Sequence, residues 1–143
     1  MTLRLDHANL AVRDLDGMIR FLQTAFPEFR VRGGGTSPTG ARWAHVGTDE
    51  VYLALSEASR DPSEPRVPYS GVPGLNHLGF EVDDVEAVHA RLLAAGYRDS
   101  TVFNAHPARK RAYVLDHEGN DWELVQYLTD DPALRHDYDL ADA

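Results

Sequence analysis

A chain of 143 residues is long enough for one domain with its own hydrophobic core, and we expect residues 1–143 to form one. It contains no cysteine, which excludes disulfides and thiolate ligands, so any metal must be bound through nitrogen and oxygen atoms. The formal net charge of -9 repels phosphate backbones and argues against nucleic-acid binding, which leaves a small molecule as the expected partner.

The N-terminal residues lack the basic flank and the long apolar run of a signal peptide. The sequence also lacks an apolar stretch of about 18 residues that could cross a bilayer. We therefore expect a cytoplasmic protein with no membrane partner.

The first predicted module covers residues 3–55. It begins with a strand predicted over residues 3–12, in which successive side chains point to alternate faces. This alternation places His7 and Asn9 on the same face of the strand. The next segment is predicted to be an amphipathic helix that Asp14 caps and Pro27 ends. Apolar residues recur there at helical spacing, at Leu15, Met18, Ile19, Leu22 and Phe26.

Three short strands are expected after this helix, over residues 29–31, 42–46 and 51–55. Three successive glycines, Gly33 to Gly35, are predicted to form a flexible turn between the first two of them. They resemble a phosphate-binding loop only superficially, because no helix, lysine or hydroxyl residue follows at the required place.

Residues 56–73 lose this periodicity and carry four prolines among charged residues, which predicts a linker. The second module, residues 74–128, then repeats the order of the first. Its helix is predicted to begin with a capping box of Asp83 and Glu86 and to stop at Gly96. Its strands are expected over residues 75–82, 97–102, 111–115 and 122–127. A polar tail, residues 129–143, follows, with Leu134, Tyr138 and Leu140 as residues that could dock it.

The two modules align at a constant offset, and His7 falls on His77 in the equivalent first strand. Internal repetition alone usually indicates architecture, but a histidine at the same place in both copies suggests a metal-binding or catalytic pair. Glu123, in the last strand, is the candidate third ligand, because burying a carboxylate without a partner is costly. Two histidines and one carboxylate suit a divalent metal with open positions. Taken singly, each histidine fits a core or surface role, and Glu123 fits a salt bridge.

These residues resemble the vicinal oxygen chelate superfamily, which includes glyoxalase I, extradiol dioxygenases, fosfomycin-resistance enzymes and bleomycin-binding proteins. The resemblance is carried by the motifs Leu5-Asp6-His7-Ala8-Asn9-Leu10 and Leu75-Asn76-His77-Leu78-Gly79-Phe80, and by Glu123 after Leu115-Asp116-His117-Glu118-Gly119-Asn120. It implies an α+β fold of two βαβββ modules that form an incomplete mixed-sheet barrel, usually within a homodimer. It further implies that His7, His77 and Glu123 bind a divalent metal ion, which could be Fe2+, Mn2+, Ni2+, Co2+ or Zn2+.

Positions at which the sequence differs from individual family members reduce the number of candidate activities. The position equivalent to Glu123 in the first module falls on Ala54, which cannot bind metal, so a four-ligand glyoxalase site is not expected. A tyrosine ten residues before the glutamate, here Tyr113, is similar to extradiol dioxygenases and fosfomycin enzymes. The lysine and serine pattern of the fosfomycin enzymes is not evident over residues 104–111.

Candidate catalytic residues are Tyr113, Arg111, His45 and His106, and candidate substrate-binding residues are Asn9, Arg111 and Tyr113. Arg111 and Tyr113 alternate onto one face of their strand, where they could hold an anionic or enolic substrate. His45 and His106 qualify because an unperturbed imidazole titrates near neutrality.

The favoured prediction is an extradiol-type dioxygenase. A glyoxalase-like lyase or isomerase is the first alternative, and a protein that sequesters a drug without chemistry is the second. We also expect a homodimer, because two short modules leave strand edges and apolar walls exposed.

Overall fold

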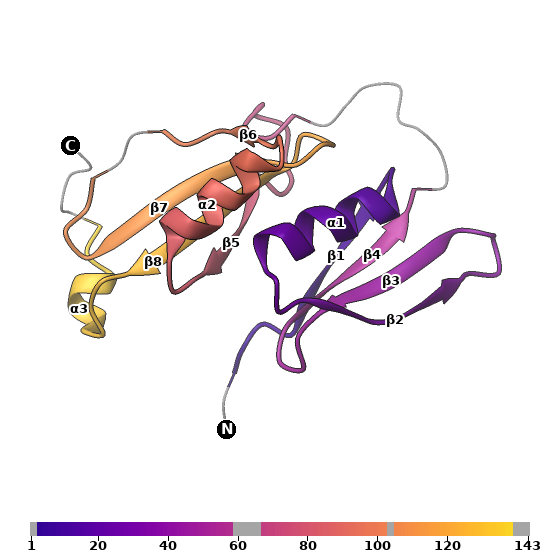
Figure 1. Cartoon of the computed structure of the whole chain (residues 1–143), viewed down its shortest axis with the longest axis horizontal. Helices are drawn as coiled ribbons and strands as arrows, with labels where there is room; N and C mark the ends of the chain where they lie inside the picture. Colours follow the sequence, from indigo (N-terminus) through magenta and orange to yellow (C-terminus); the bar gives the residue numbers. More distant parts are fainter. Residues whose placement is uncertain (1–2, 59–66, 103–104, 139–143) are drawn as a thin grey trace. The chain divides into compact units, whose positions relative to one another are not determined.

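The computed structural model describes residues 3–58, 67–102 and 105–138, which fall into two compact units (Figure 1). Unit 1 spans Met1–Pro65 and unit 2 spans Arg66–Ala143. Most of the predicted linker, residues 59–66, and Leu140 of the predicted tail lie outside the described residues. In the part of the chain that is described, no helix has the length and apolar character needed to cross a bilayer.

Each unit contains one four-stranded mixed sheet. The elements of unit 1 are β1 (His7–Val12), α1 (Leu15–Ala25), β2 (Arg30–Thr36), β3 (Arg42–Gly47) and β4 (Tyr52–Glu57). Those of unit 2 are β5 (His77–Glu81), α2 (Val85–Ala94), β6 (Arg98–Asp99), β7 (Arg109–Leu115), β8 (Asp121–Tyr127) and α3 (Pro132–Arg135). The sheet orders, β1-β4-β3-β2 and β5-β8-β7-β6, are the same, which confirms the predicted α+β fold of two βαβββ modules.

The first strand of each unit pairs in parallel with the last strand of the same unit. In unit 1, Asn9 lies opposite Ala54, and in unit 2 Gly79 lies opposite Glu123. The offset that matches His7 to His77 also matches Asn9 to Gly79, so the strand register confirms Ala54 as the counterpart of Glu123.

Helix α1 forms the core of unit 1 by packing on β3 and β4 (Figure 1). Asp14 caps it as predicted, since its carboxylate accepts a hydrogen bond from the Gly17 N–H at 2.8 Å. The predicted stripe is largely correct, although Ile19 is only half-buried and Phe21 is buried instead. The helix buries Leu15, Met18, Phe21, Leu22 and Ala25, and burial of each large apolar side chain stabilises the fold by about 1.5 to 3 kcal/mol.

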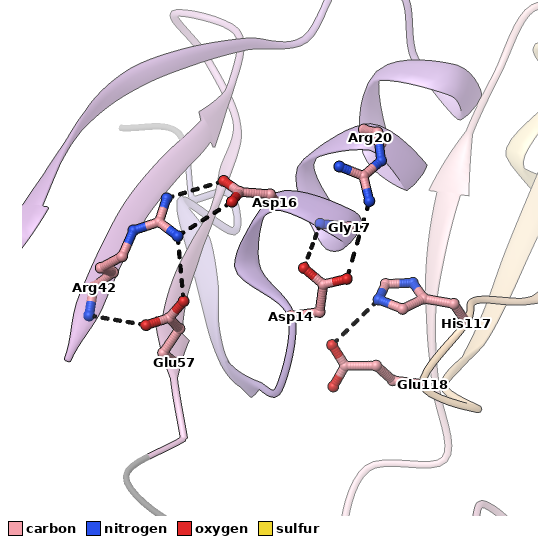
Figure 2. A network of polar contacts seen from close by, with 8 residues as sticks. All are labelled: Asp14, Asp16, Gly17, Arg20, Arg42, Glu57, His117 and Glu118. Atoms are coloured by element: carbon pink, nitrogen blue, oxygen red, sulfur yellow. Dashed lines mark hydrogen bonds and ion pairs between the residues drawn. The ribbon is translucent and has the colours of Figure 1, made fainter.

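Arg42, at the start of β3, ties that strand to the helix and to the end of β4 (Figure 2). Its guanidinium donates to both carboxylate oxygens of Asp16, at 2.9 and 3.2 Å, and to Glu57 at 3.4 Å. The hydrogen bond from Arg42 lowers the pKa of Asp16. Because the Arg42 and Asp16 side chains are at least half exposed, this network contributes orientation more than stability.

The prediction that the three glycines form a turn was wrong, because they lie within β2 and pair with β3. A β-carbon on Gly34 would lie 2.8 Å from the backbone oxygen of Trp43, so a side chain there would force the two strands apart. A register shift between Val31 and Gly33 marks a bulge in this edge strand. The glycines therefore permit a close strand approach.

The capping box predicted for the second helix was also misplaced by one residue. Asp84, and not Asp83, is the N-cap of α2, and its carboxylate accepts from the Ala87 N–H at 3.0 Å. The expected stop at Gly96 is confirmed, since this residue adopts a positive φ of 96° just after the helix. The strand expected over residues 97–102 is reduced to the two residues of β6.

The turn between β7 and β8 is built around the buried carboxylate of Asp116. It accepts from the backbone N–H groups of Glu118 and Asn120, at 2.8 and 3.0 Å. It also accepts from the Asn120 side-chain amide and from the Trp122 indole N–H, both at 2.9 Å. Asp116 therefore satisfies four donors and sets the place at which β8 begins.

We predict that Asp116→Ala lowers the free energy of unfolding by roughly 3 kcal/mol, because it leaves several donors, including a buried indole N–H, without an acceptor. Chemical denaturation monitored by tryptophan fluorescence and circular dichroism would measure the change. Asp83→Ala is the matched control, since this exposed aspartate does not cap the helix. A loss for Asp116→Ala no larger than about 0.5 kcal/mol, the scale of surface substitutions, would contradict the prediction.

Candidate metal centre

One face of the unit 2 sheet packs against α2, and the opposite face carries the candidate site residues. Trp122 and Leu124 of β8 are buried residues, and α2 packs on this strand and on β7. Since successive residues of a strand point to opposite faces, Glu123 points away from that core. Tyr113 lies opposite Glu123, and Arg111 lies opposite Val125, so the face that Arg111 and Tyr113 share is also the face of Glu123.

His77 and Glu123 meet on this face. The His77 Nε2 atom is 2.9 Å from the Glu123 Oε2 atom, and both side chains are largely shielded from solvent. Gly79 follows His77 by two residues on β5 and lies directly opposite Glu123 on β8. A β-carbon on Gly79 would lie 3.4 Å from Glu123 Oε2, in ordinary van der Waals contact, so this position borders the carboxylate.

Tyr113 lies against the His77–Glu123 pair. Its ring meets the His77 ring edge-on, with centroids 5.6 Å apart. Burial, followed by the charge of the Glu123 carboxylate and a hydrogen bond to it, raises the pKa of Tyr113 to about 12. The phenol therefore stays protonated at neutral pH and can act as a hydrogen-bond donor on this face.

The other side of His77 is occupied by Tyr69, a residue that sequence reasoning missed. The Tyr69 hydroxyl lies 2.5 Å from His77 Nδ1 and donates to Asp121 Oδ2 at 3.0 Å. Ser100 donates to the second oxygen of Asp121 at 2.6 Å. Burial and the hydrogen bond with Asp121 raise the pKa of Tyr69 to about 12. Asp121 was detectable in the sequence, because it shares the alternation of Glu123, whereas nothing distinguished Tyr69 in its proline-rich segment.

The remaining candidates from the first module lie in unit 1. His7 Nδ1 is 2.8 Å from Asp6 Oδ2, and this hydrogen bond lowers the pKa of Asp6. The His7 ring stacks on Tyr52 with centroids 4.7 Å apart, and His45 contacts the same tyrosine at 4.8 Å. Asn9 is exposed on β1, opposite Ala54.

His106 binds backbone groups through both ring nitrogens. Its Nδ1 accepts from the Ala108 N–H, and its Nε2 donates to the carbonyl oxygen of Asp137, each at 3.0 Å. The tail is also held by Arg109, which donates to the Arg135 carbonyl oxygen at 3.0 Å. These polar contacts dock the tail, while the predicted docking residue Leu134 is 45% exposed. A catalytic role for His106 remains a prediction.

The donor chemistry of the His77–Glu123 pair fits a divalent cation. A neutral imidazole nitrogen and a carboxylate oxygen are both acceptors, so at 2.9 Å they require a proton or a cation between them. Two such ligands bound about 2.1 Å from one metal at a right angle are about 3 Å apart. Within residues 3–58, 67–102 and 105–138 the structure forms no group of three or more histidine and acidic side chains suited to a metal. The pair therefore supplies two of the ligands that such an ion needs.

The chain belongs to the Glyoxalase/Bleomycin resistance protein/Dioxygenase superfamily, whose sequence profile matches residues 4–124. This match confirms the resemblance inferred from the histidine and glutamate motifs. A search against curated protein sequences finds no match.

Solved structures share the fold. A glyoxalase family protein from Bacillus cereus has a TM-score of 0.74 at 18% identity, over 90% of this chain and 97% of that one. A glyoxylase/bleomycin resistance protein/dioxygenase domain from Frankia sp. EAN1pec has a TM-score of 0.74 at 20% identity, with coverage of 96% and 100%. The fosfomycin resistance protein FosX from Listeria monocytogenes, solved with Mn(II) and sulfate, has a TM-score of 0.69 at 20% identity, with coverage of 94% and 98%.

The raised pKa of Tyr113 gives a pH-dependent prediction. The folded, metal-free protein keeps the phenol proton up to about pH 12, whereas an unfolded chain releases it near pH 10. The contribution to stability is therefore complete below about pH 10 and is lost as the pH rises toward 12. In a tyrosinate absorbance titration, Tyr113→Phe should remove about half of the late step that Tyr113 shares with Tyr69.

Tyr138→Phe is the control, because it removes an exposed phenol and should leave the late step unchanged. If Tyr113→Phe removes absorbance only from a step near pH 10, the described environment of Tyr113 is wrong.

Proposed function

We propose that this protein is a divalent-metal-dependent enzyme that acts on a small molecule able to bind the metal through two neighbouring oxygen atoms. The observation that carries the proposal is the convergence of His77 Nε2 and Glu123 Oε2, which lie 2.9 Å apart on the face of the sheet opposite α2. Membership of the superfamily supports the same conclusion.

His7 is the proposed third ligand. Its Nδ1 atom is engaged by Asp6, and the Nδ1 atom of His77 is engaged by Tyr69. In both histidines the Nε2 atom is thereby left as the metal-facing nitrogen, which is the usual arrangement of ligating imidazoles.

The metal is proposed to be one that accepts nitrogen and oxygen ligands, from the set Fe2+, Mn2+, Ni2+, Co2+ and Zn2+. The Mn(II) complex of the FosX protein from Listeria supports a divalent ion in this fold. When bound, such an ion would act as a Lewis acid that polarises the substrate oxygens.

Two residues of this chain are suited to bind and orient the substrate. Tyr113 keeps its proton at neutral pH, so its hydroxyl can donate a hydrogen bond to a substrate oxygen on which negative charge develops. Arg111 lies on the same face and its positive charge opposes the rise in the pKa of Tyr113, which indicates that the two groups are close. Together they favour an anionic or enolic substrate.

The reaction class remains a proposal. Tyr113, ten residues before Glu123, is similar to both extradiol dioxygenases and fosfomycin enzymes, and the lack of the fosfomycin enzymes' lysine and serine pattern over residues 104–111 favours extradiol-type ring cleavage. Addition to a small phosphonate is a second candidate, because a mutant of the Listeria FosX protein was solved with Mn(II) and 1S,2S-dihydroxypropylphosphonic acid, a vicinal diol. A glyoxalase-like lyase or isomerase and a sequestration protein remain the alternatives, and a homodimer remains a prediction.

The first test of the proposal is metal content. We predict about one divalent ion per chain, and a loss of most of it in His77→Ala and Glu123→Ala, because each substitution removes one of few ligands. Elemental analysis and calorimetric titration would measure it, with circular dichroism to show that the variants fold.

His89→Ala is the matched control. This histidine lies on α2 and contacts Asp99 at 3.0 Å, so its loss should leave the metal content unchanged. Full metal occupancy in both His77→Ala and Glu123→Ala would rule out the proposed centre.

The second test is turnover by the loaded protein. Iron(II) protein with oxygen would be assayed on catechols, manganese(II) protein on fosfomycin, and nickel(II) or zinc(II) protein on hemithioacetals. With whichever substrate reacts, we predict that Tyr113→Phe lowers kcat by about 10-fold to 1,000-fold through the loss of one charge-stabilising donor, while metal content is unchanged. Tight metal binding without turnover of any of these substrates would favour sequestration, and wild-type kcat in Tyr113→Phe would remove this residue from the mechanism.

A further inference from the structure

The two units hold their equivalent histidines in different ways. In unit 1 the residue before His7 is Asp6, whose carboxylate accepts directly from Nδ1 at 2.8 Å. At the equivalent place before His77 the chain has Asn76, whose side chain instead accepts from the backbone N–H of Tyr69 at 2.9 Å. It is the hydroxyl of Tyr69 that then reaches His77 Nδ1, at 2.5 Å.

The proton positions in this second arrangement follow from the groups present. A tyrosine hydroxyl has one proton, and an ionised carboxylate can only accept. Since Tyr69 donates its proton to Asp121 at 3.0 Å, its oxygen must accept at the short contact with His77. The Nδ1 atom of His77 therefore carries a ring proton, which leaves the Nε2 lone pair for a cation held between Nε2 and Glu123.

Several contacts fix Tyr69 in this position although the residue is 58% exposed. Its backbone adopts a φ of 62°, a conformation that residues other than glycine rarely adopt and that persists only where surrounding contacts enforce it. Asn76 binds its backbone, and Ser100 saturates the oxygen of Asp121 that Tyr69 does not use. The hydroxyl is thus directed at one nitrogen of one histidine.

We propose that Tyr69 is a positioning residue that, with Asp121 behind it, fixes the tautomer and orientation of His77 so that Nε2 is ready to bind a metal. The proposal rests on the metal-dependent function proposed above. It assigns to a residue from the segment between the two modules the part that Asp6 plays for His7. Outer partners of metal-binding histidines commonly act in this way, by accepting from the ring nitrogen that does not bind the metal.

The test compares Tyr69→Phe with wild type in two measurements. Nitrogen-15 NMR of the metal-free protein, at alkaline pH where the ring is neutral, reports which His77 nitrogen carries the proton. Calorimetric titration with zinc(II) reports affinity. We expect wild-type His77 in the Nδ1–H form, a mixture of tautomers in Tyr69→Phe, and an affinity for zinc(II) that falls about 10-fold to 100-fold.

Tyr127→Phe is the matched control. It removes a hydroxyl from the same strand as Glu123 but keeps the ring on which the Arg135 guanidinium lies, at 4.0 Å, so both readouts should match wild type. The role of Tyr69 is overturned if wild-type His77 is mainly in the Nε2–H form. Wild-type affinity in Tyr69→Phe overturns it too, whether or not the tautomer changes. Failure of the wild-type protein to bind any divalent ion would instead overturn the proposed function, so the two failures are distinguishable.

Discussion

The parallel pairing of β5 with β8 is the contact on which the site depends. These strands are far apart in sequence, and their pairing sets Gly79 opposite Glu123, which brings the carboxylate to His77, two residues before Gly79. A shift of one residue would turn Glu123 into the core beneath α2, since neighbouring residues of a strand face opposite ways. Asp116 helps to fix this register, because its four hydrogen bonds hold the turn from which β8 starts.

Unit 1 has the same sheet topology but different side chains on the equivalent face. At the positions equivalent to Glu123 and Tyr113, unit 1 has Ala54 and His45, which lie opposite each other on β4 and β3. Without a carboxylate, the face of this sheet is occupied by stacked rings, with the Arg32 guanidinium 4.1 Å above the ring of Tyr52. The duplicated fold thus keeps one histidine in each copy, but only in the second copy does the last strand supply an acidic partner for it, since the partner of His7 is the preceding residue, Asp6.

Much of this fold could be predicted from the sequence, because helix α1 and strands β7 and β8 carry strong local patterns. The failures have physical causes. The three glycines suggested a turn because their flexibility is visible in the sequence, while the close approach of β3 that requires Gly34 is a tertiary contact. Asp83 and Asp84 are chemically alike, and only the backbone geometry decides which one caps α2.

The site was predictable to a similar degree. The shared face of Arg111, Tyr113 and Glu123 follows from strand alternation once β7 and β8 are known to pair. Tyr69 could not be found in this way, because it lies in an irregular segment without periodicity and acts through a contact with a distant strand. Its left-handed backbone conformation has no signal in the sequence either, because tyrosine is not one of the residues that favour a positive φ.

Two carboxylates, those of Asp121 and Glu123, lie on the face of β8 opposite α2, and they differ in their hydrogen-bond partners. Asp121 is buried and accepts a hydroxyl hydrogen bond at each oxygen, from Ser100 and from Tyr69. Glu123 accepts from Tyr113 but also directs Oε2 at His77 Nε2. Satisfying Asp121 with neutral donors keeps its charge in place behind Tyr69, where it orients the imidazole. Glu123 is the acidic group on the face opposite α2 that meets His77 at Nε2.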